Sequence, residues 1–285
     1  MPGRRADGFH EIVTLLQTVS LADKLTFQSR DDTRVTLTYE GAPQIPLDAT
    51  NLVLRAARAL QERYGRKNGA EIHLSKQIPA GGGLGGGSSN AAVTLLGLAQ
   101  LWDLPATPAE LREIGAQLGA DVPFFLLGGL ALGSGLGTEL ELLDDLPPQC
   151  LAIVAPGVGV STADAYRALN ASPLTKEDAI YILTDSRAAR AIGESFPAAL
   201  HNDFERVVLR QEPEIAAAKA ALYEAGARTA LMSGSGSSVF GLFDNEIAQQ
   251  QAVARLSGWQ VFACHTVTQA AYRQALGLCA ARLLH

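Results

Sequence analysis

The stretch Pro79-Ala80-Gly81-Gly82-Gly83-Leu84-Gly85-Gly86-Gly87-Ser88-Ser89-Asn90 decides how the rest of the chain is interpreted. Six of the seven residues in 81–87 are glycine, so the backbone there can adopt positive φ and approach a ligand closely. The run before it, 70–75, alternates like a β-strand, and the run after it repeats apolar residues at helical spacing. The loop is therefore predicted to join a strand to a helix whose N-cap lies within 88–90. Unpaired N–H groups and the positive end of the helix dipole then favour an anion such as phosphate.

Other glycine-rich patterns fit this stretch less well. A P-loop requires Gly-x-x-x-x-Gly-Lys-Ser/Thr, but Gly82 to Gly87 is followed by Ser88, and the loop has no lysine. The spacing Gly81-x-Gly83-x-x-Gly86 matches a dinucleotide fingerprint, yet a second helix is expected where that fold has a strand. The protein-kinase motifs His-Arg-Asp and Asp-Phe-Gly are absent. A flexible linker is disfavoured, because linkers seldom join a strand to a strongly amphipathic helix.

The composition is that of an ordinary globular protein. With 47% hydrophobic and 18% charged residues, extensive disorder is not expected, and 285 residues allow two domains. The net charge of −6 argues against a nucleic acid polymer as partner. Cys150, Cys264 and Cys279 are odd in number and widely spaced, which favours a reducing compartment over a disulfide framework. No run is long enough to span a membrane and no signal-peptide core is seen, so we expect a cytoplasmic protein without a membrane partner.

The order of expected elements divides the chain into domains at 1–147 and 148–285. In the first part we expect strands at 12–27 (broken near 20–23), 34–39, 70–76 and twice within 128–143, and helices after Asn51, at 88–102 and at 108–118. In the second part we expect strands at 151–155, 228–231, 239–243 and 260–265, with helices at 213–225 and 246–256 and a helical pattern over 172–212. Strands and helices in this order predict a ferredoxin-like α+β domain for the second part.

Asp121 is the candidate acid. It stands in Leu118-Gly119-Ala120-Asp121-Val122-Pro123-Phe124-Phe125, where we expect a helix to end at Gly119 and an apolar strand to follow the acid. Its apolar neighbours predict a partly shielded carboxylate. The alternative is a turn residue whose side chain binds nearby N–H groups.

A second loop, Met232-Ser233-Gly234-Ser235-Gly236-Ser237-Ser238, is also rich in glycine and serine. A plain tight turn is one interpretation. If the two loops face each other across a cleft, the first would hold phosphates and the second would close over the acceptor.

These stretches together resemble the GHMP kinase superfamily, which includes galactokinase, homoserine kinase and mevalonate kinase. Pro79 to Ser89 is similar to the Pro-x-x-x-Gly-Leu-Gly-Ser-Ser-like loop, and Gly234 to Ser237 to the C-terminal Gly-x-Gly-Ser-like loop. The likeness is closest to members acting on a cytidine-diphosphate-linked methylerythritol in the non-mevalonate isoprenoid pathway. It rests further on 4–11, 51–53, 118–124 and 202–205. The resemblance implies an α+β, two-domain GHMP kinase fold, with a ribosomal-protein-like N-terminal and a ferredoxin-like C-terminal domain.

The resemblance also implies ATP-dependent phosphorylation of the 2-hydroxyl of that substrate, with Mg²⁺. By position, Asp121 is the base that accepts the hydroxyl proton. Pro79, Ala80, Gly81, Gly82, Gly83, Leu84, Gly85, Gly86, Gly87, Ser88 and Ser89 hold the ATP phosphates. Phe9 stacks on the cytosine, His10 hydrogen-bonds it, and Asn202, Asp203, Gly234, Ser235 and Gly236 contact the substrate. Ser88 or Ser89 could bind Mg²⁺ or a phosphate oxygen, or only cap the helix; the metal ligands stay unassigned.

The chain also departs from the family pattern. Phe9 stands where the family has tyrosine, and Leu200-His201 where an aromatic residue is usual. A first strand carrying Ala-Lys-x-Asn is not found before Gly3, so we expect that strand, and the lysine beside Asp121, to be missing. Two alternatives stay open: a kinase of homoserine or mevalonate, against which Gly8-Phe9-His10 counts, or a catalytically weakened nucleotide-binding relative.

Overall fold

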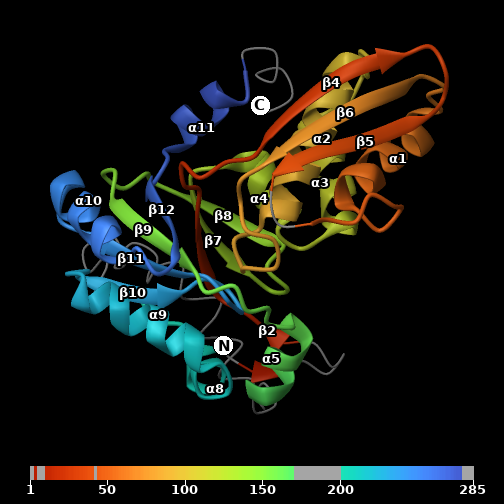
Figure 1. The fold of residues 1–285 in the computed structure, drawn as a ribbon. Helices are drawn as coiled ribbons and strands as arrows, with labels where there is room; N and C mark the ends of the chain where they lie inside the picture. Colours follow the sequence, from red (N-terminus) through yellow and green to blue (C-terminus); the bar gives the residue numbers. More distant parts are fainter. Residues whose placement is uncertain (1–2, 5–9, 42–43, 170–199, 278–285) are drawn as a thin grey trace. The chain divides into compact units, whose positions relative to one another are not determined.

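The structure is a computed structural model that describes residues 3–4, 10–41, 44–169 and 200–277 (Figure 1). Phe9, Cys279 and the expected helical stretch over 172–199 lie outside the described residues. The chain forms two compact units: unit 1 comprises Met1–Ser20, Gly81–Leu84 and Leu132–Val267, and unit 2 comprises Leu21–Ala80, Gly85–Ala131 and Thr268–His285. These units are interleaved along the chain, and the division into 1–147 and 148–285 stays a prediction.

Unit 2 is built on a three-stranded sheet in the order β4-β6-β5. Strand β4 (Lys24–Arg30) runs antiparallel to β6 (Gly69–Lys76), and β5 (Val35–Gly41) runs parallel to it. A parallel pair requires a crossover connection, which helix α1 (Leu52–Tyr64) supplies. Helix α1 begins directly after Asn51, as predicted, and Asn51 caps it: its side chain accepts a hydrogen bond of 2.9 Å from the N–H of Val53.

Helix α2 (Gly86–Leu101) is the central element of the core of unit 2. It contacts α1, β4, α3 (Pro108–Leu118) and α4 (Val122–Leu127), and Figure 1 shows α1 and α2 against the sheet. Buried residues surround it on most sides, among them Ala91, Leu95 and Leu98, each 0% exposed. A helix that is apolar on most sides belongs inside a protein, so its N-terminus is held in a fixed place.

The strand expected after Asp121 is wrong, because these residues form helix α4. Pro123 lies in its first turn, where its missing N–H leaves no carbonyl unpaired, and Gly128 follows the last turn with φ of 69°. A short apolar run suits a strand or a buried helix equally well. Pro123 near the start of the run and Gly128 after its end favour the helix.

Unit 1 contains a four-stranded antiparallel sheet in the order β10-β11-β9-β12. Its strands are β9 (Cys150–Ala155), β10 (Thr229–Met232), β11 (Val239–Phe243) and β12 (Gln260–His265). The helices described in this unit are α5 (Thr162–Leu169), α8 (Glu205–Gln211), α9 (Pro213–Glu224) and α10 (Glu246–Arg255). The chain order and the sheet order together confirm the predicted ferredoxin-like arrangement.

The remaining elements are short. A second sheet has the order β3-β7-β8, formed by β3 (Thr14–Gln17), β7 (Leu130–Ser134) and β8 (Glu139–Leu143), and β1 (Gly3–Arg4) pairs with β2 (His10–Glu11). In unit 2, α11 (Gln269–Ala275) packs on the end of α4. There the Tyr272 hydroxyl donates a 2.6 Å hydrogen bond to the carbonyl of Phe125, and burial raises the pKa of Tyr272.

Within unit 1, residues Gly81–Leu84 lie against the loop that joins β10 to β11. The N–H of Ser238 donates to the carbonyl of Gly82 at 3.0 Å, and the hydroxyl of Ser233 donates to the carbonyl of Gly83 at 2.8 Å. A Cβ at position 83 would lie 2.3 Å from the carbonyl oxygen of Ser233 and 2.8 Å from that of Gly236. Only glycine allows this approach of two backbones.

We therefore expect Gly83→Ala to destabilise the protein more than Gly81→Ala. Both glycines have similar left-handed φ, 72° and 69°, but a Cβ at Gly81 meets no atom within 4 Å. Both variants suffer the left-handed strain of about 1–2 kcal/mol, and the collision at 83 adds about 1–3 kcal/mol. Calorimetry should show a Tm for Gly83→Ala that is a further 2–10 °C lower, roughly. Equal Tm values for the two variants would contradict the tight contact.

Candidate active site

The first part of the site is the start of helix α2. Its N-cap is Gly85, with φ of 67°, so the expected cap within Ser88–Asn90 is wrong by about one turn. Gly86 and Gly87 already belong to the helix, and the first of its backbone bonds runs from the N–H of Ser89 to the carbonyl of Gly85 at 2.8 Å. The helix begins early because glycine at the cap needs no side-chain bond. No side chain in the described part of the chain caps α2, so its first N–H groups stay available for a ligand.

The second part is Asp121, the residue that precedes α4. Its carboxylate makes no capping hydrogen bond to the helix, so the interpretation of Asp121 as a turn residue bonded to nearby N–H groups does not hold among the described residues. The residue is exposed, yet neighbouring atoms displace part of the water around its carboxyl group. This desolvation raises the pKa of Asp121 above its ordinary value.

Two close contacts in unit 2 bring these parts together. A methyl group at Gly119 would lie 3.9 Å from the hydroxyl oxygen of Ser88, in the first turn of α2. A Cβ at Gly85 would lie 2.7 Å from the ring of Phe125 in α4. The loop before α2 therefore packs directly on α4, and the segment that carries Asp121 lies beside the open N-terminus of α2.

A group of aromatic side chains lies within unit 1. The ring of His10 stacks on Tyr166 of α5, with centroids 4.9 Å apart and an angle of 30°. Tyr166 in turn meets Phe204 edge-on at 4.9 Å. His10 is one of the residues that the resemblance implies for substrate binding, and that role stays a prediction; its stacking partner Tyr166 has no such signal, because one aromatic residue in an amphipathic helix is indistinguishable from a core residue. The only signal for Tyr166 in the sequence is its position in the helical stretch that directly follows the strand at 151–155.

The second glycine loop is held by polar side chains of the motif at 202–205. Both N–H groups of the Asn202 amide donate to carbonyls, of Met232 at 2.7 Å and of Gly234 at 2.8 Å. Its oxygen accepts from the N–H of Phe204 at 2.9 Å. Glu205 accepts from the N–H of Met232 at 2.8 Å and pairs with Lys219 at 2.5 Å. Asn202 therefore shapes the loop; the substrate contacts of Asn202, Asp203, Gly234, Ser235 and Gly236 stay predictions.

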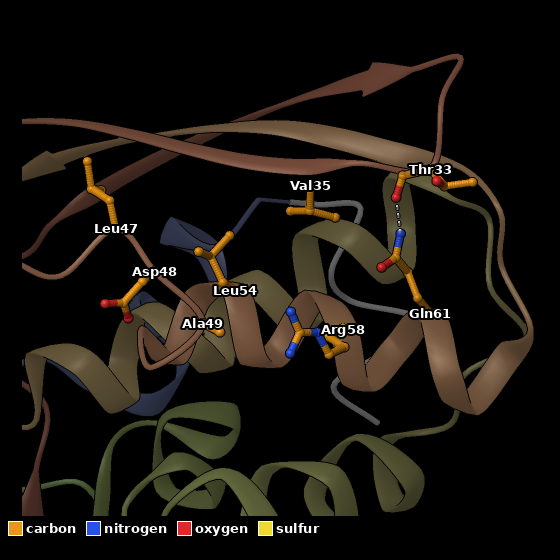
Figure 2. A pocket seen from close by; sticks show the side chains of 8 residues that line it. All are labelled: Thr33, Val35, Leu47, Asp48, Ala49, Leu54, Arg58 and Gln61. Atoms are coloured by element: carbon orange, nitrogen blue, oxygen red, sulfur yellow. Dashed lines mark hydrogen bonds between the residues drawn. The ribbon is translucent and has the colours of Figure 1, made fainter.

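A pocket of about 270 Å³ lies beside α1 in unit 2 and contains none of the predicted site residues. Figure 2 shows Val35, Leu47 and Leu54 as its apolar lining, with Asp48 and Arg58 nearby. Gln61 donates a 3.0 Å hydrogen bond to the carbonyl of Thr33 at one end.

Three general features concern the described residues only. No group of three or more His, Cys, Asp or Glu residues there is placed to hold a metal ion. Between the two cysteines that the structure describes, Cys150 and Cys264, there is no disulfide bond. None of the helices described has the length and apolar character needed to cross a membrane.

Comparison with known proteins identifies the family of this chain. The family model described as GHMP kinases N terminal domain matches residues 51–129, and that described as GHMP kinases C terminal matches residues 178–259. The 4-diphosphocytidyl-2-C-methyl-D-erythritol kinase of Moorella thermoacetica is 46% identical over 255 residues, 88% of each chain. The enzyme of the same name from Solibacter usitatus is 42% identical, over 95% of this chain and 85% of its own.

Solved structures show the same fold. A crystal structure of 4-(cytidine 5'-diphospho)-2C-methyl-D-erythritol kinase superposes with a TM-score of 0.76 at 35% identity, over 92% of both chains. L. major mevalonate kinase, solved with R-mevalonate, shares the fold at 12% identity, with a TM-score of 0.65 over 91% of this chain and 90% of its own. The predicted two-domain fold is confirmed, and the chain belongs to the GHMP kinase family.

Proposed function

We propose that this chain uses ATP to phosphorylate the 2-hydroxyl of 4-diphosphocytidyl-2-C-methyl-D-erythritol, a step of the non-mevalonate route to isoprenoid precursors. The chain is a small-molecule kinase by family, and relatives 39–46% identical carry the name of this activity. The observation that supports the proposal is that the segment carrying Asp121, whose side chain makes no capping bond, lies beside the open N-terminus of α2. A base next to an anion-binding helix end is what phosphoryl transfer to an alcohol requires.

The triphosphate of ATP is proposed to bind the loop from Pro79 to Ser89. Backbone N–H groups of this loop and of the first turn of α2 offer hydrogen bonds without side chains in the way. The Ser88 hydroxyl is a hard oxygen ligand of the kind Mg²⁺ prefers, so this residue fits a Mg²⁺ that comes with the phosphates. When bound, Mg²⁺ supplies neutralisation of phosphate charge.

Asp121 is proposed as the general base. As the 2-hydroxyl oxygen of the substrate forms its bond to the γ-phosphorus, the bond from that phosphorus to ADP breaks and the hydroxyl proton passes to the Asp121 carboxylate. The raised pKa of Asp121 suits this role, because a carboxylate with a pKa nearer neutrality is a stronger base.

The cytosine is proposed to bind at the aromatic group of unit 1. Tyr166 is half-buried and offers a ring for stacking, and the His10 ring beside it carries nitrogen atoms for hydrogen bonds to the base. Phe9, Asp203 and the loop at 234–236 complete the proposed substrate contacts, and Asn202 is proposed to act on the substrate through the shape of that loop. With no membrane or nucleic acid partner expected, we propose a cytoplasmic location.

ADP release with three alcohols tests the substrate. We expect turnover with the cytidyl substrate and at most trace activity with mevalonate or homoserine, since only the first carries a base for the aromatic group to stack on. Preference for mevalonate or homoserine would point to another GHMP kinase. ATP binding without turnover of any alcohol would point to a catalytically weakened relative.

Asp121→Asn tests the base. We expect kcat to fall by a factor of about 10²–10⁴, with little change in ADP affinity measured by calorimetry. An unchanged kcat would remove Asp121 from this role.

Asp121→Asn should also change how the free energy of unfolding depends on pH. A carboxyl group whose pKa is raised by folding favours the folded state at low pH, and this contribution is lost as the pH rises through the raised value. Asp121→Asn should therefore be at least as stable as the wild type at pH 7, and this relative gain should vanish in acid. The exposed Glu113→Gln, which removes the same charge from the neighbouring α3, serves as control. Denaturant titrations at both pH values give the comparison.

Tyr166→Ala tests the cytosine site. Stacking of a base on an aromatic ring contributes about 1–3 kcal/mol, so the KM for the cytidyl substrate should rise roughly 5- to 100-fold while the KM for ATP stays constant. Tyr166→Phe keeps the ring and should retain the wild-type KM. If both variants behave like the wild type, the cytosine binds elsewhere.

A further inference from the structure

A buried ion pair lies under the first turn of α2, in unit 2. The Asp23 carboxylate and the Lys76 ammonium are 2.8 Å apart, and their side chains are only 1% and 4% exposed. A methyl group at Gly86, the first residue of α2, would lie 3.4 Å from the Lys76 nitrogen. The pair therefore directly underlies the helix end at which the phosphates are proposed to bind.

Asp23 is fully occupied by donors. Besides Lys76, its oxygens accept from the N–H of Gln77 at 2.7 Å, from the N–H of Ile78 at 2.8 Å and from the Asn90 side-chain amide at 2.9 Å. Lys76 also donates to the carbonyl of Ile78. One carboxylate thus binds the segment that enters the glycine loop and the second turn of the helix that leaves it.

The register of the sheet explains how these residues meet. Lys24 of β4 pairs with Ser75 of β6, so the residue before β4, Asp23, comes next to Lys76 at the end of β6. Asn90 lies on the buried side of α2, 4% exposed, and faces the same point. The Asp23 carboxylate therefore links the end of strand β6, the segment that enters the glycine loop and helix α2.

A gain in folding stability does not by itself explain why Asp23 and Lys76 form a buried ion pair here. Taking two charges out of water costs about as much as their attraction returns, and apolar replacements of buried ion pairs are often neutral or stabilising. What an apolar cluster cannot do is bind backbone N–H groups and an amide at fixed positions. The ionic form provides four directed bonds on one group.

We infer that Asp23 and Asn90 are positioning residues for nucleotide binding: they fix both ends of the glycine loop so that its N–H groups point at the phosphates before ATP arrives. Lys76 cancels the charge of Asp23, which would otherwise repel the triphosphate from below. The inference rests on the proposed phosphate site, since it assigns a function to the support of that site. None of these three side chains needs to touch the nucleotide.

The first test compares two buried polar residues of α2. Asn90→Ala removes the bond to Asp23, whereas Thr94→Val, one turn further on, removes only the 2.7 Å bond from its hydroxyl to the carbonyl of Asn90. Both side chains are buried. We expect Asn90→Ala to weaken ADP binding by about tenfold or more, because the loop must be ordered on binding, and Thr94→Val to leave ADP affinity unchanged at a similar loss of Tm. Equal ADP affinities in the two variants would overturn the inference.

The second test changes the charge balance between Asp23 and Lys76. It compares a single variant with a double variant in which neutrality is restored, so that a loss of folding can be recognised. Lys76→Met leaves the Asp23 charge unbalanced, so ADP affinity should fall. Adding Asp23→Asn restores neutrality and keeps an acceptor for the N–H groups of Gln77 and Ile78, so the double variant should regain affinity. If the double variant regains Tm but not ADP binding, the charge balance is purely structural and the inference about Lys76 fails.

A variant at Gly87 tests the proposed phosphate site independently of the positioning role of Asp23 and Asn90. Gly87 is exposed and helical, and a Cβ there would make only an ordinary contact, 3.5 Å from Leu52. Gly87→Asp should therefore fold and repel the triphosphate. If it binds ADP like the wild type, the proposed phosphate site is wrong. If it loses ADP while Asn90→Ala matches Thr94→Val, the phosphate site stands and the positioning role is wrong.

Discussion

A glycine loop has no side chains with which to hold its own shape, and that constraint governs the structure around it. Each glycine loses more conformational freedom on folding than any other residue, so a segment with six of them must be held from outside. In unit 1 the carbonyls of Gly82 and Gly83 are bound by the loop after β10. In unit 2 the entry to the loop is bound by Asp23, and Gly85 packs on Phe125. Polar atoms far away in sequence supply what the loop lacks.

This explains which parts of the site the sequence predicts. The strand before the loop, the helix after it and the cap at Asn51 follow from local patterns, and the structure confirms them. The start of α2 and the helix after Asp121 were mispredicted, because glycines at a helix start and a short apolar run each fit two structures. Asp23 had no signal at all: 55 residues separate it from Ile78, and only the register of β4 on β6 brings them together.

The motif at 202–205 shows a related limit. A family motif identifies residues that the site needs, but it does not distinguish a residue that binds the ligand from one that shapes the loop. Asn202 uses both N–H groups and its oxygen on the backbone, and Glu205 binds the backbone and Lys219. An amide with its donors used inside the protein has little left to offer a substrate. Its replacement would act on the substrate through the shape of the loop.

Asp121 differs from Asn202, because its side chain makes no capping bond to the backbone of the helix that follows it. An aspartate before a helix usually caps it, and such a cap contributes about 0.5–2 kcal/mol, yet Asp121 makes no capping bond. The helix dipole at this position would lower the pKa of a carboxylate, but the pKa of Asp121 is raised, so desolvation outweighs the dipole of this short helix. The residue therefore forgoes a capping bond, and its carboxylate bears a desolvation cost in the folded state. A carboxylate with a raised pKa and no capping bond does not favour folding, and these two properties suit the proposed role of Asp121 as a base.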